Sequence, residues 1–515
     1  MANEQRVVII GGGIAGLAAA LRLADNGCKV AIVEKRAMLG GRASSLPLRA
    51  DGSGDADVAV EAGAESAVQP PGGVSARVTS GSIGATTAAE PEMVDNCQHV
   101  LMRCCVNLLD FYKRIGAANS VEFSDHFTFV DRKNRWSTLS ASAWLPAPFH
   151  LLPSLLAFGS MNPIDKLSIA YGMVRLIRLS PEQRDNHKTS FLKWLQRNLQ
   201  TPNAIESFWR PIVVSALNEE PGNTAAAYGF QLFREAFLRT RRGYEMGLPR
   251  VTLSEIYSGS GGAALKKKGV QIHPGERVSR IVVEDGRVAG ICLNDSYVLI
   301  ATDIVVSAVP HHVLPALLDT QTRLMPPFRD LSDLETSPIT GVHLWFDRSI
   351  TDVPHVALLG REMQWIFNKG ANGTGNGKGR GKAGQGSYLG LVVSASRSLT
   401  DRPKAEIVAM ALDAIHNVFP DSRSAALVRE LVIREKRATF SPSPKAEALR
   451  PSQRSPIKGL YLCGDWTQTG WPATMEGAVR SGYLAAESVL HDAGKDVKLL
   501  AEEPKADLIP RLLGL

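Results

Sequence analysis

The segment RVVIIGGGIAGLAAALRLADNGCKVAIVE, residues 6–34, decides the fold of this chain. Residues 6–10 form a β-branched run, which predicts a strand buried on both faces. Residues 14–26 are rich in Ala and Leu and favour a helix, and a second apolar run, residues 29–33, closes on Glu34. The segment therefore predicts a complete βαβ unit within about 30 residues.

The glycines at the first turn of this unit follow the Gly-x-Gly-x-x-Gly fingerprint of dinucleotide-binding folds. Gly11 permits the tight turn, Gly13 lets the backbone approach a pyrophosphate, and Gly16 lets the helix pack closely on the strand. The helix N-terminus offers free N–H groups to phosphates, and Glu34 is placed to accept hydrogen bonds from ribose hydroxyls. The cofactor contacts predicted in this segment are Gly11, Gly12, Gly13, Ile14, Ala15, Gly16, Glu34 and Lys35.

Two further motifs favour FAD over NAD as the dinucleotide. Residues 39–42, Leu-Gly-Gly-Arg, follow Glu34; the glycine pair, which includes Gly41, allows close backbone approach, and Arg42 can contact phosphate or flavin oxygens. Far downstream, Gly464-Asp465 ends an apolar strand and precedes a helix expected from about Thr474 to Leu490. Asp465 can bind the ribityl hydroxyls, and the N-terminus of that helix can face the N1/O2 edge of the flavin.

The bulk composition excludes several classes of protein. The 515 residues are 44% hydrophobic, enough for the cores of two or three domains. The 58 basic and 51 acidic residues give a net charge of +7 without a dense basic block, so nucleic-acid binding is not expected. Six scattered cysteines without a CxxC pair indicate a reducing compartment and no metal site. Without a signal-peptide pattern or a run of about 18 apolar residues, the protein is expected in the cytoplasm or peripherally on the inner face of the cytoplasmic membrane.

Nucleotide-binding elements at the start, middle and end of the chain predict an α/β fold. We expect a Rossmann-type FAD-binding domain assembled from discontinuous segments, with an inserted α+β substrate domain. Residues 278–293 should form a hairpin turning at 284–286, and residues 302–310 a buried strand. Residues 50–92 and 370–386 are low in complexity and predict flexible insertions. The expected FAD-binding segments are 1–99, 241–315 and 436–495, and the expected substrate-domain segments are 100–240, mainly helical, and 316–435, mainly sheet, followed by a tail, 496–515.

The opening residues 11–45 and the closing residues 460–487 resemble the flavin amine oxidase and phytoene desaturase superfamily. Interior stretches resemble, more narrowly, the hydroxysqualene dehydroxylase (squalene-associated FAD-dependent desaturase) family of squalene and hopanoid synthesis. These stretches are residues 94–99, 208–211, 215–218, 248–251, 337–347, 393–397 and 435–440. One position departs from the resemblance, because Cys97 stands where many relatives have glycine.

The resemblance implies an enzyme that reduces hydroxysqualene to squalene, with hydride supplied by reduced FAD and the allylic hydroxyl leaving as water. It also implies roles for single residues. Arg42 lies near the flavin, the backbone of Val278 meets the adenine, Asp465 contacts the ribityl chain or pyrophosphate, and Met475 lies at a helix start beside the isoalloxazine. The implied partners are a hydroxysqualene-like isoprenoid and an electron donor.

Removal of an allylic hydroxyl needs a proton donor, and Asp95 and His99 are the candidates for that catalytic role. They belong to a polar cluster that follows the first low-complexity stretch directly. The alternative is that Asp95 and Asn96 cap a helix beginning near Gln98.

Residues 144–161 are apolar but broken by three prolines. They either dip into a membrane interface and admit substrate or form a buried wall of the substrate domain. Four tryptophans could line a hydrocarbon tunnel or belong to the core: Trp136, Trp209, Trp345 and Trp365. Other functions also suit this fold, namely a carotenoid desaturase or isomerase, an amine oxidase, or a non-catalytic isoprenoid carrier.

Overall fold

A computed structural model describes residues 5–48, 58–59, 92–294, 299–302, 304–370 and 386–515 of the chain. The first βαβ unit forms as the sequence predicts. Strand β1 (Arg6–Ile10) and strand β2 (Lys29–Glu34) are parallel neighbours, and helix α1 (Ile14–Asp25) joins them. Helix α1 is almost wholly buried because its Ala and Leu side chains pack against helix α14 (Met475–Asp492), from the other end of the chain.

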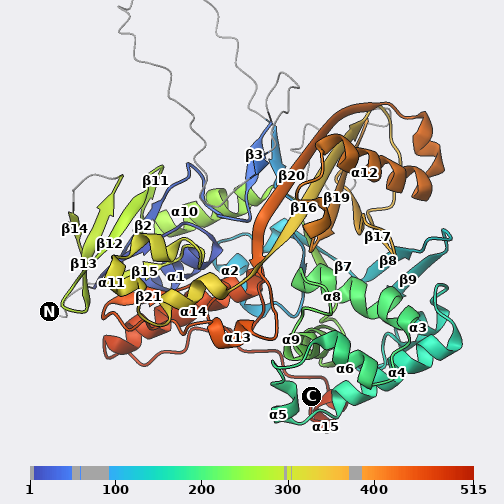
Figure 1. Cartoon of the computed structure of the whole chain (residues 1–515), viewed down its shortest axis with the longest axis horizontal. Helices are drawn as coiled ribbons and strands as arrows, with labels where there is room; N and C mark the ends of the chain where they lie inside the picture. Colours follow the sequence, from blue (N-terminus) through green and yellow to red (C-terminus); the bar gives the residue numbers. More distant parts are fainter. Residues whose placement is uncertain (1–4, 49–57, 60–91, 295–298, 303, 371–385) are drawn as a thin grey trace, which may run out of the picture.

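Strand β1 lies at the centre of a five-stranded parallel sheet of order β11-β2-β1-β15-β21 (Figure 1, left). Its other strands come from distant segments: β11 (Gln271–Pro274), β15 (Val305–Ser307) and β21 (Leu460–Leu462). This sheet confirms the Rossmann-type α/β class built from discontinuous segments. In such sheets, ligands bind outside the carboxyl ends of the strands.

The strand expected over residues 302–310 is observed only as β15, although one main-chain hydrogen bond to β1 follows on each side, from the Val8 N–H to the Ile304 carbonyl and from the Ala308 N–H to the Ile10 carbonyl. The Thr302 hydroxyl accepts the Ile304 N–H, and Pro310 has no N–H to donate. The predicted hairpin is confirmed as β12 (Val278–Glu284) and β13 (Arg287–Leu293), with Asp285 and Gly286 at positive φ in the turn. A third strand, β14 (Leu299–Ala301), pairs with β13.

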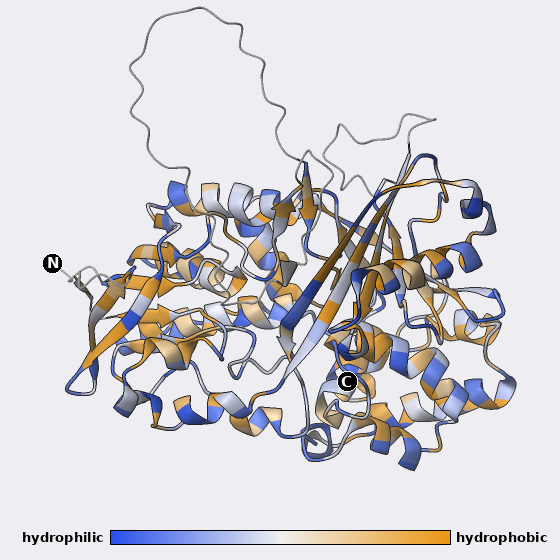
Figure 2. Cartoon of the chain, turned by 45° about the horizontal axis from the view of Figure 1, so that its top comes forward, coloured by the Kyte–Doolittle hydropathy of each residue, from blue (hydrophilic) through white to orange (hydrophobic). Residues whose placement is uncertain are grey.

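The other half of the molecule is built on an eight-stranded mixed sheet of order β4-β20-β16-β19-β18-β17-β8-β9 (Figure 1, right). The strands are β4 (Val58–Ala59), β20 (Leu427–Phe440), β16 (Thr336–Phe346), β19 (Ser387–Ser394), β18 (Trp365–Asn368), β17 (His355–Leu358), β8 (His126–Val130) and β9 (Trp136–Ser140). Helix α12 (Lys404–Val418) packs its apolar face on this sheet. Hydrophobic residues run along the strands of both halves (Figure 2).

A helical layer completes this half and encloses an aromatic core. Its main helices are α3 (Leu152–Ala157), α4 (Pro163–Ile177), α6 (Phe191–Arg197), α8 (Arg210–Leu217) and α9 (Ala226–Phe233). Residues 100–240 are mainly helical, as expected, but they also include a group of strands near their start. Residues 121–140 form three strands, because alternating aromatic and polar side chains such as those of His126–Val130 favour strands. Helix α2 (Val106–Arg114) packs instead against α14, in the nucleotide-binding half.

Most of the two low-complexity stretches, residues 50–92 and 370–386, lies outside the described residues. Within the first stretch, β4 pairs in parallel with β20 through Val58–Ile433 and Ala59–Arg434. Among the helices of the described residues, none combines the length and the apolar character needed to cross a membrane.

Candidate active site

One cavity of about 1650 Å³ extends from the first βαβ unit into the eight-stranded half. It exceeds the roughly 300–1,000 Å³ of an ordinary small-molecule pocket. The lining residues at the nucleotide-binding end include Gly11, Gly13, Glu34, Lys35, Gly41, Arg42, Val278, Gly464, Asp465 and Met475, and those at the other end include Phe127, Phe129, Leu139, Phe237 and Trp365. The cavity therefore has room for a dinucleotide and an apolar molecule together.

The glycine loop forms the floor of the nucleotide-binding end. Helix α1 begins after its N-cap residue Gly13, and no side chain caps its first N–H groups. Ile14 and Ala15, at the start of the helix, line the cavity with Gly11 and Gly13. An open helix N-terminus that carries no acidic residue in its first turn suits a pyrophosphate, because the free N–H groups and the helix dipole attract negative charge.

Two of the predicted loop contacts, Gly12 and Gly16, shape the loop and do not line the cavity. A Cβ atom on Gly16 would collide with the carbonyl oxygen of Gly11, and one on Gly12 would lie 2.5 Å from the Leu39 side chain. The Gly12 N–H donates to Glu34 Oε2 at 2.6 Å and so holds this carboxylate at the end of β2. Glu34 therefore faces the cavity where a ribose would lie.

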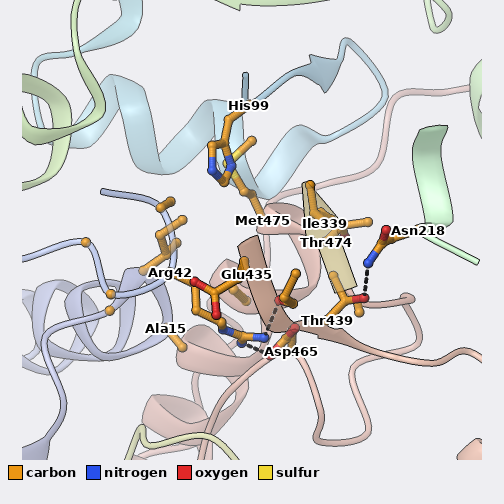
Figure 3. Close-up of a pocket in the computed structure, with 18 of the residues that line it drawn as sticks. Ala15, Arg42, His99, Asn218, Ile339, Glu435, Thr439, Asp465, Thr474 and Met475 are labelled. Atoms are coloured by element: carbon orange, nitrogen blue, oxygen red, sulfur yellow. Dashed lines mark hydrogen bonds and ion pairs between the residues drawn. The ribbon is translucent and has the colours of Figure 1, made fainter. Parts of the chain in front are cut away.

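Arg42 and Asp465 form an ion pair on the cavity wall, although they lie 423 positions apart in the sequence (Figure 3). Arg42 also donates to the Ala438 carbonyl at 2.8 Å. Burial opposes the charge on Arg42, but the Asp465 carboxylate outweighs it and raises the pKa of the guanidinium. Gly464, at φ +138°, turns the chain after β21, and this turn directs Asp465 into the cavity.

The N-terminus of α14 faces the same cavity. The Thr474 hydroxyl accepts the Gly477 N–H at 3.0 Å and caps the helix, and Met475 lines the cavity. The buried Glu476 also lines the cavity, and its carboxylate accepts hydrogen bonds from Asn107 and from the Leu108 N–H of α2. The helix thus lies where the sequence predicts it.

The structure separates the two predicted proton donors. His99 lines the cavity, whereas Asp95 does not. Asp95 ends strand β5 (Met93–Asp95), and its Oδ1 accepts hydrogen bonds from Ser45 Oγ at 2.7 Å and from the Leu253 N–H at 2.9 Å. These bonds give Asp95 a structural task, and the predicted catalytic role of Asp95 is not supported by its position.

The alternative for this segment, a helix beginning near Gln98, is wrong. In the described chain the first helix after Asp95 is α2, which begins at Val106. The Asn96 side chain caps no helix and donates instead to the Arg42 carbonyl at 2.8 Å. The pairing of β5 with β3 (Ser45–Pro47) holds the segment in an extended conformation, which the local sequence does not reveal.

His99 reaches the cavity but is a poor proton donor. Its Nε2 lies 3.1 Å from Asn96 Oδ1. Burial, with a smaller contribution from the charge of Lys369, lowers the pKa of His99 to about 4. The imidazole is therefore neutral near pH 7, and it suits positioning of a ligand better than protonation of a leaving group.

Glu435, on strand β20, is a candidate acid that sequence reasoning missed. It lines the cavity at 5% exposure, and its carboxylate points toward Arg42 (Figure 3). Neither carboxylate oxygen has a partner within hydrogen-bonding geometry among the described residues. Burial raises the pKa of Glu435 to about 7, although Arg42, Arg36 and the Arg437 N–H oppose this shift. A carboxyl group with this pKa can carry a proton at neutral pH.

The other end of the cavity is lined by hydrophobic side chains from both sheet and helices. Of the four tryptophans considered for a tunnel, Trp365 lines the cavity, and its Nε1 donates to Ser215 Oγ at 2.7 Å. Trp209 is buried in the helical core, Trp345 stacks on Tyr388, and Trp136 is partly exposed. The cavity therefore changes from polar to apolar along its length, with Glu435 between the two ends.

Comparison with known proteins agrees with this geometry. The family model for flavin-containing amine oxidoreductases matches residues 14–490. The chain is similar to 15-cis-phytoene desaturase of Solanum lycopersicum, with 25% identity over 510 residues, 96% of this chain and 80% of the relative. It is also similar to 15-cis-phytoene desaturase of Synechococcus elongatus, at 24% identity over 94% of this chain and 96% of the relative. Zeta-carotene desaturase of Synechocystis sp. is 24% identical over 94% of this chain and 97% of its own length.

Solved structures share the fold at low sequence identity. An oxidoreductase from Methanosarcina mazei has a TM-score of 0.64 and 18% identity, and the match covers 95% of this chain and 100% of that one. Putrescine oxidase bound to putrescine has a TM-score of 0.63 and 13% identity, over 95% of this chain and 99% of that one. These likenesses confirm the predicted architecture.

Proposed function

The chain belongs to the flavin-containing amine oxidoreductase family and is an FAD-dependent oxidoreductase, and we propose that its substrate is a long acyclic isoprenoid. The observation that carries this proposal is a large continuous cavity, whose apolar end adjoins the polar end without a dividing wall. When bound, FAD accepts or donates a hydride.

The residues of the polar end fit FAD. The open N-terminus of α1 would hold the pyrophosphate, and Glu34 would accept the ribose hydroxyls. Arg42 and Asp465 would bind toward the flavin and the ribityl chain, close to the N-terminus of α14. The apolar end would hold hydrocarbon and exclude water from the reacting carbon.

The relatives favour dehydrogenation as the first candidate reaction. Proteins named phytoene desaturase and zeta-carotene desaturase match this chain over nearly its whole length. For such a reaction, the task of Phe127, Phe129 and Trp365 would be to hold a polyene chain extended in the cavity.

A specific observation supports a second candidate, the reduction of hydroxysqualene to squalene. A pure hydrocarbon gives the buried, unpaired Glu435 carboxyl no task, whereas an allylic alcohol does. Protonated Glu435 would donate its proton to the hydroxyl oxygen, which would then leave as water. The interior stretches that resemble the hydroxysqualene dehydroxylase family include Glu435 itself, at the start of residues 435–440.

Anaerobic turnover by the purified, flavin-loaded protein distinguishes these reactions. Reduced enzyme with hydroxysqualene is expected to form squalene if the second candidate is correct, whereas oxidised enzyme with phytoene should lose its flavin absorbance if the first is correct. Putrescine serves as the comparison substrate for an amine oxidase. If the protein converts neither hydroxysqualene nor phytoene, the proposed substrate class is refuted.

A variant tests the role of Glu435. Glu435→Gln should slow squalene formation by about 100-fold or more, because general-acid catalysis typically contributes that much, and the flavin content should not change. Glu430→Gln is the matched control, since Glu430 lies on the same strand with a partly exposed side chain paired to Lys404. An unaltered rate in Glu435→Gln would remove Glu435 from the reaction, whichever substrate the enzyme accepts.

A further inference from the structure

The surface formed by residues 144–178, here called the α3–α4 face, exposes a large amount of apolar side chain. None of residues 137–164 is Asp, Glu, Lys or Arg. The exposed large hydrophobic residues of this face are Trp144 at 92%, Phe149, Leu152, Leu156, Ile164, Leu167 at 72%, Tyr171 and Val174. Contiguous apolar surface of this kind marks an interaction site in a soluble fold.

Helix α4 has two apolar faces. Ile169 and Leu176 point into the helical core, and Gly172 is buried on the same side. Ile164, Leu167, Tyr171 and Val174 recur at three- and four-residue spacing and are exposed, so they form a stripe on the opposite side. The structure thus accounts for the inner face of α4 and leaves the outer stripe in contact with solvent (Figure 1, lower right).

The exposed charged residues of α4 and of its C-cap position are positive. Arg175 and Arg178 are exposed at the C-terminal end of α4. The acidic residue of the helix, Asp165, is buried and accepts hydrogen bonds from Thr201 and Asn203. An apolar stripe with a cationic rim is the pattern of a helix that lies in the interface of an anionic bilayer.

The α3–α4 face lies next to the apolar end of the cavity. Strand β9 connects the two, because Leu139 lines the cavity while the Ser140 N–H donates to Ser154 Oγ of α3 at 3.1 Å. The ring of Phe129, another lining residue, lies 5.3 Å from that of Phe158, which follows α3. Direct contacts of β9 and Phe129 with α3 and Phe158 therefore connect the α3–α4 face to the wall of the cavity.

We propose that the α3–α4 face docks on an anionic lipid surface. A second copy of the chain is the poorer occupant, because the outer stripe of α4 offers no acidic side chain to complement the two arginines. The lipid contact goes beyond the proposed function, since it concerns where the enzyme binds. The docking proposal does not depend on the substrate. A further step, in which an isoprenoid substrate passes from the lipid through this face to the cavity, rests on the proposed function.

Flotation of the flavin-loaded full chain with vesicles tests this proposal without substrate. Binding is expected to phosphatidylcholine vesicles that contain phosphatidylglycerol, and Leu167→Glu with Val174→Glu should lower it by roughly ten-fold or more, because both charges would enter the apolar interface. Leu324→Glu is the matched control, since Leu324 is 64% exposed and lies in the nucleotide-binding half, outside the α3–α4 face. The variants should keep the flavin spectrum and the melting temperature of the unaltered protein.

Three outcomes would overturn the proposal. The unaltered protein could fail to float with anionic vesicles, or the double variant could float as well as the unaltered protein. The double variant could also convert a dimer to a monomer in solution without changing vesicle binding, which would assign the face to a second copy. Because no substrate is present, each result is independent of the reaction that the enzyme catalyses.

Discussion

At the polar end of the cavity, main-chain N–H groups and paired charges form the wall, whereas aromatic and aliphatic side chains from β8, β9 and β18 form the wall at the other end. At the polar end, each contact depends on a glycine, a helix start or a strand end, so a small change in backbone conformation should weaken cofactor binding. At the apolar end, contacts depend on volume, and several different side chains can fill the same space. The two ends should therefore respond differently to substitution.

The largest effect is expected in the glycine loop. Gly16→Ala places a methyl group against the Gly11 carbonyl oxygen, so we expect more than about 3 kcal/mol of destabilisation and loss of bound flavin. Gly259→Ala is the matched control, because its methyl group would meet only the Ser254 carbonyl oxygen, at 3.8 Å, and Gly259 does not line the cavity. Thermal unfolding measures the stability of each variant, and the flavin-to-protein ratio measures its bound flavin. Equal stability of the two variants would contradict the proposed difference in packing.

An intermediate effect is expected from Glu435, which lies between the two ends. Its pKa is raised from an ordinary value of 4.5 to about 7, so the folded state favours the protonated form. The associated stability is fully present below pH 4.5 and is lost as pH rises through 7, a change of about 3 kcal/mol.

Glu435→Gln should remove this part of the pH dependence. Urea unfolding at pH 5 and pH 8 measures it in the variant and in the unaltered protein. If the two proteins lose the same stability between these pH values, Glu435 does not have the raised pKa.

The smallest effect is expected at the apolar end. Trp365→Phe loses the hydrogen bond to Ser215 but keeps a ring beside Phe127 and Phe367, so a cost of about 1 kcal/mol is expected. Flavin content should stay unchanged, while the KM for the isoprenoid should rise. Denaturant unfolding, flavin absorbance and steady-state kinetics check these points, and a loss of flavin would show that the two ends are coupled.

Sequence reasoning succeeded where function follows from local pattern. The strand, glycine turn and helix of residues 6–34 are consecutive, and Gly464-Asp465 ends a strand just before a helix, so periodicity and turn chemistry identify them. The resemblance to the flavin amine oxidase superfamily is confirmed. The relatives found are phytoene and zeta-carotene desaturases, and hydroxysqualene reduction remains a proposal.

It failed where burial decides a role. Asp95 looks like an acid in a polar cluster, but β3 and the Leu253 N–H enclose it away from the cavity. Glu435 belongs to a stretch with several charged residues, and nothing local distinguishes a carboxylate that faces a cavity from one that faces solvent. The same holds for the α3–α4 face, because the sequence of an apolar stretch does not show whether its side chains are buried or exposed.

The sequence by itself determined the dinucleotide fold, because a glycine turn between a strand and a helix has few other physical uses and its residues are neighbours in the chain. Only the tertiary structure decided the chemistry of the cavity. The pairing of Arg42 with Asp465, the isolation of Glu435 and the exposure of α4 depend on contacts between segments far apart in the chain. These contacts determine how far each group is removed from water. Desolvation in turn sets the pKa of a buried carboxyl group, and it cannot be read from any single segment.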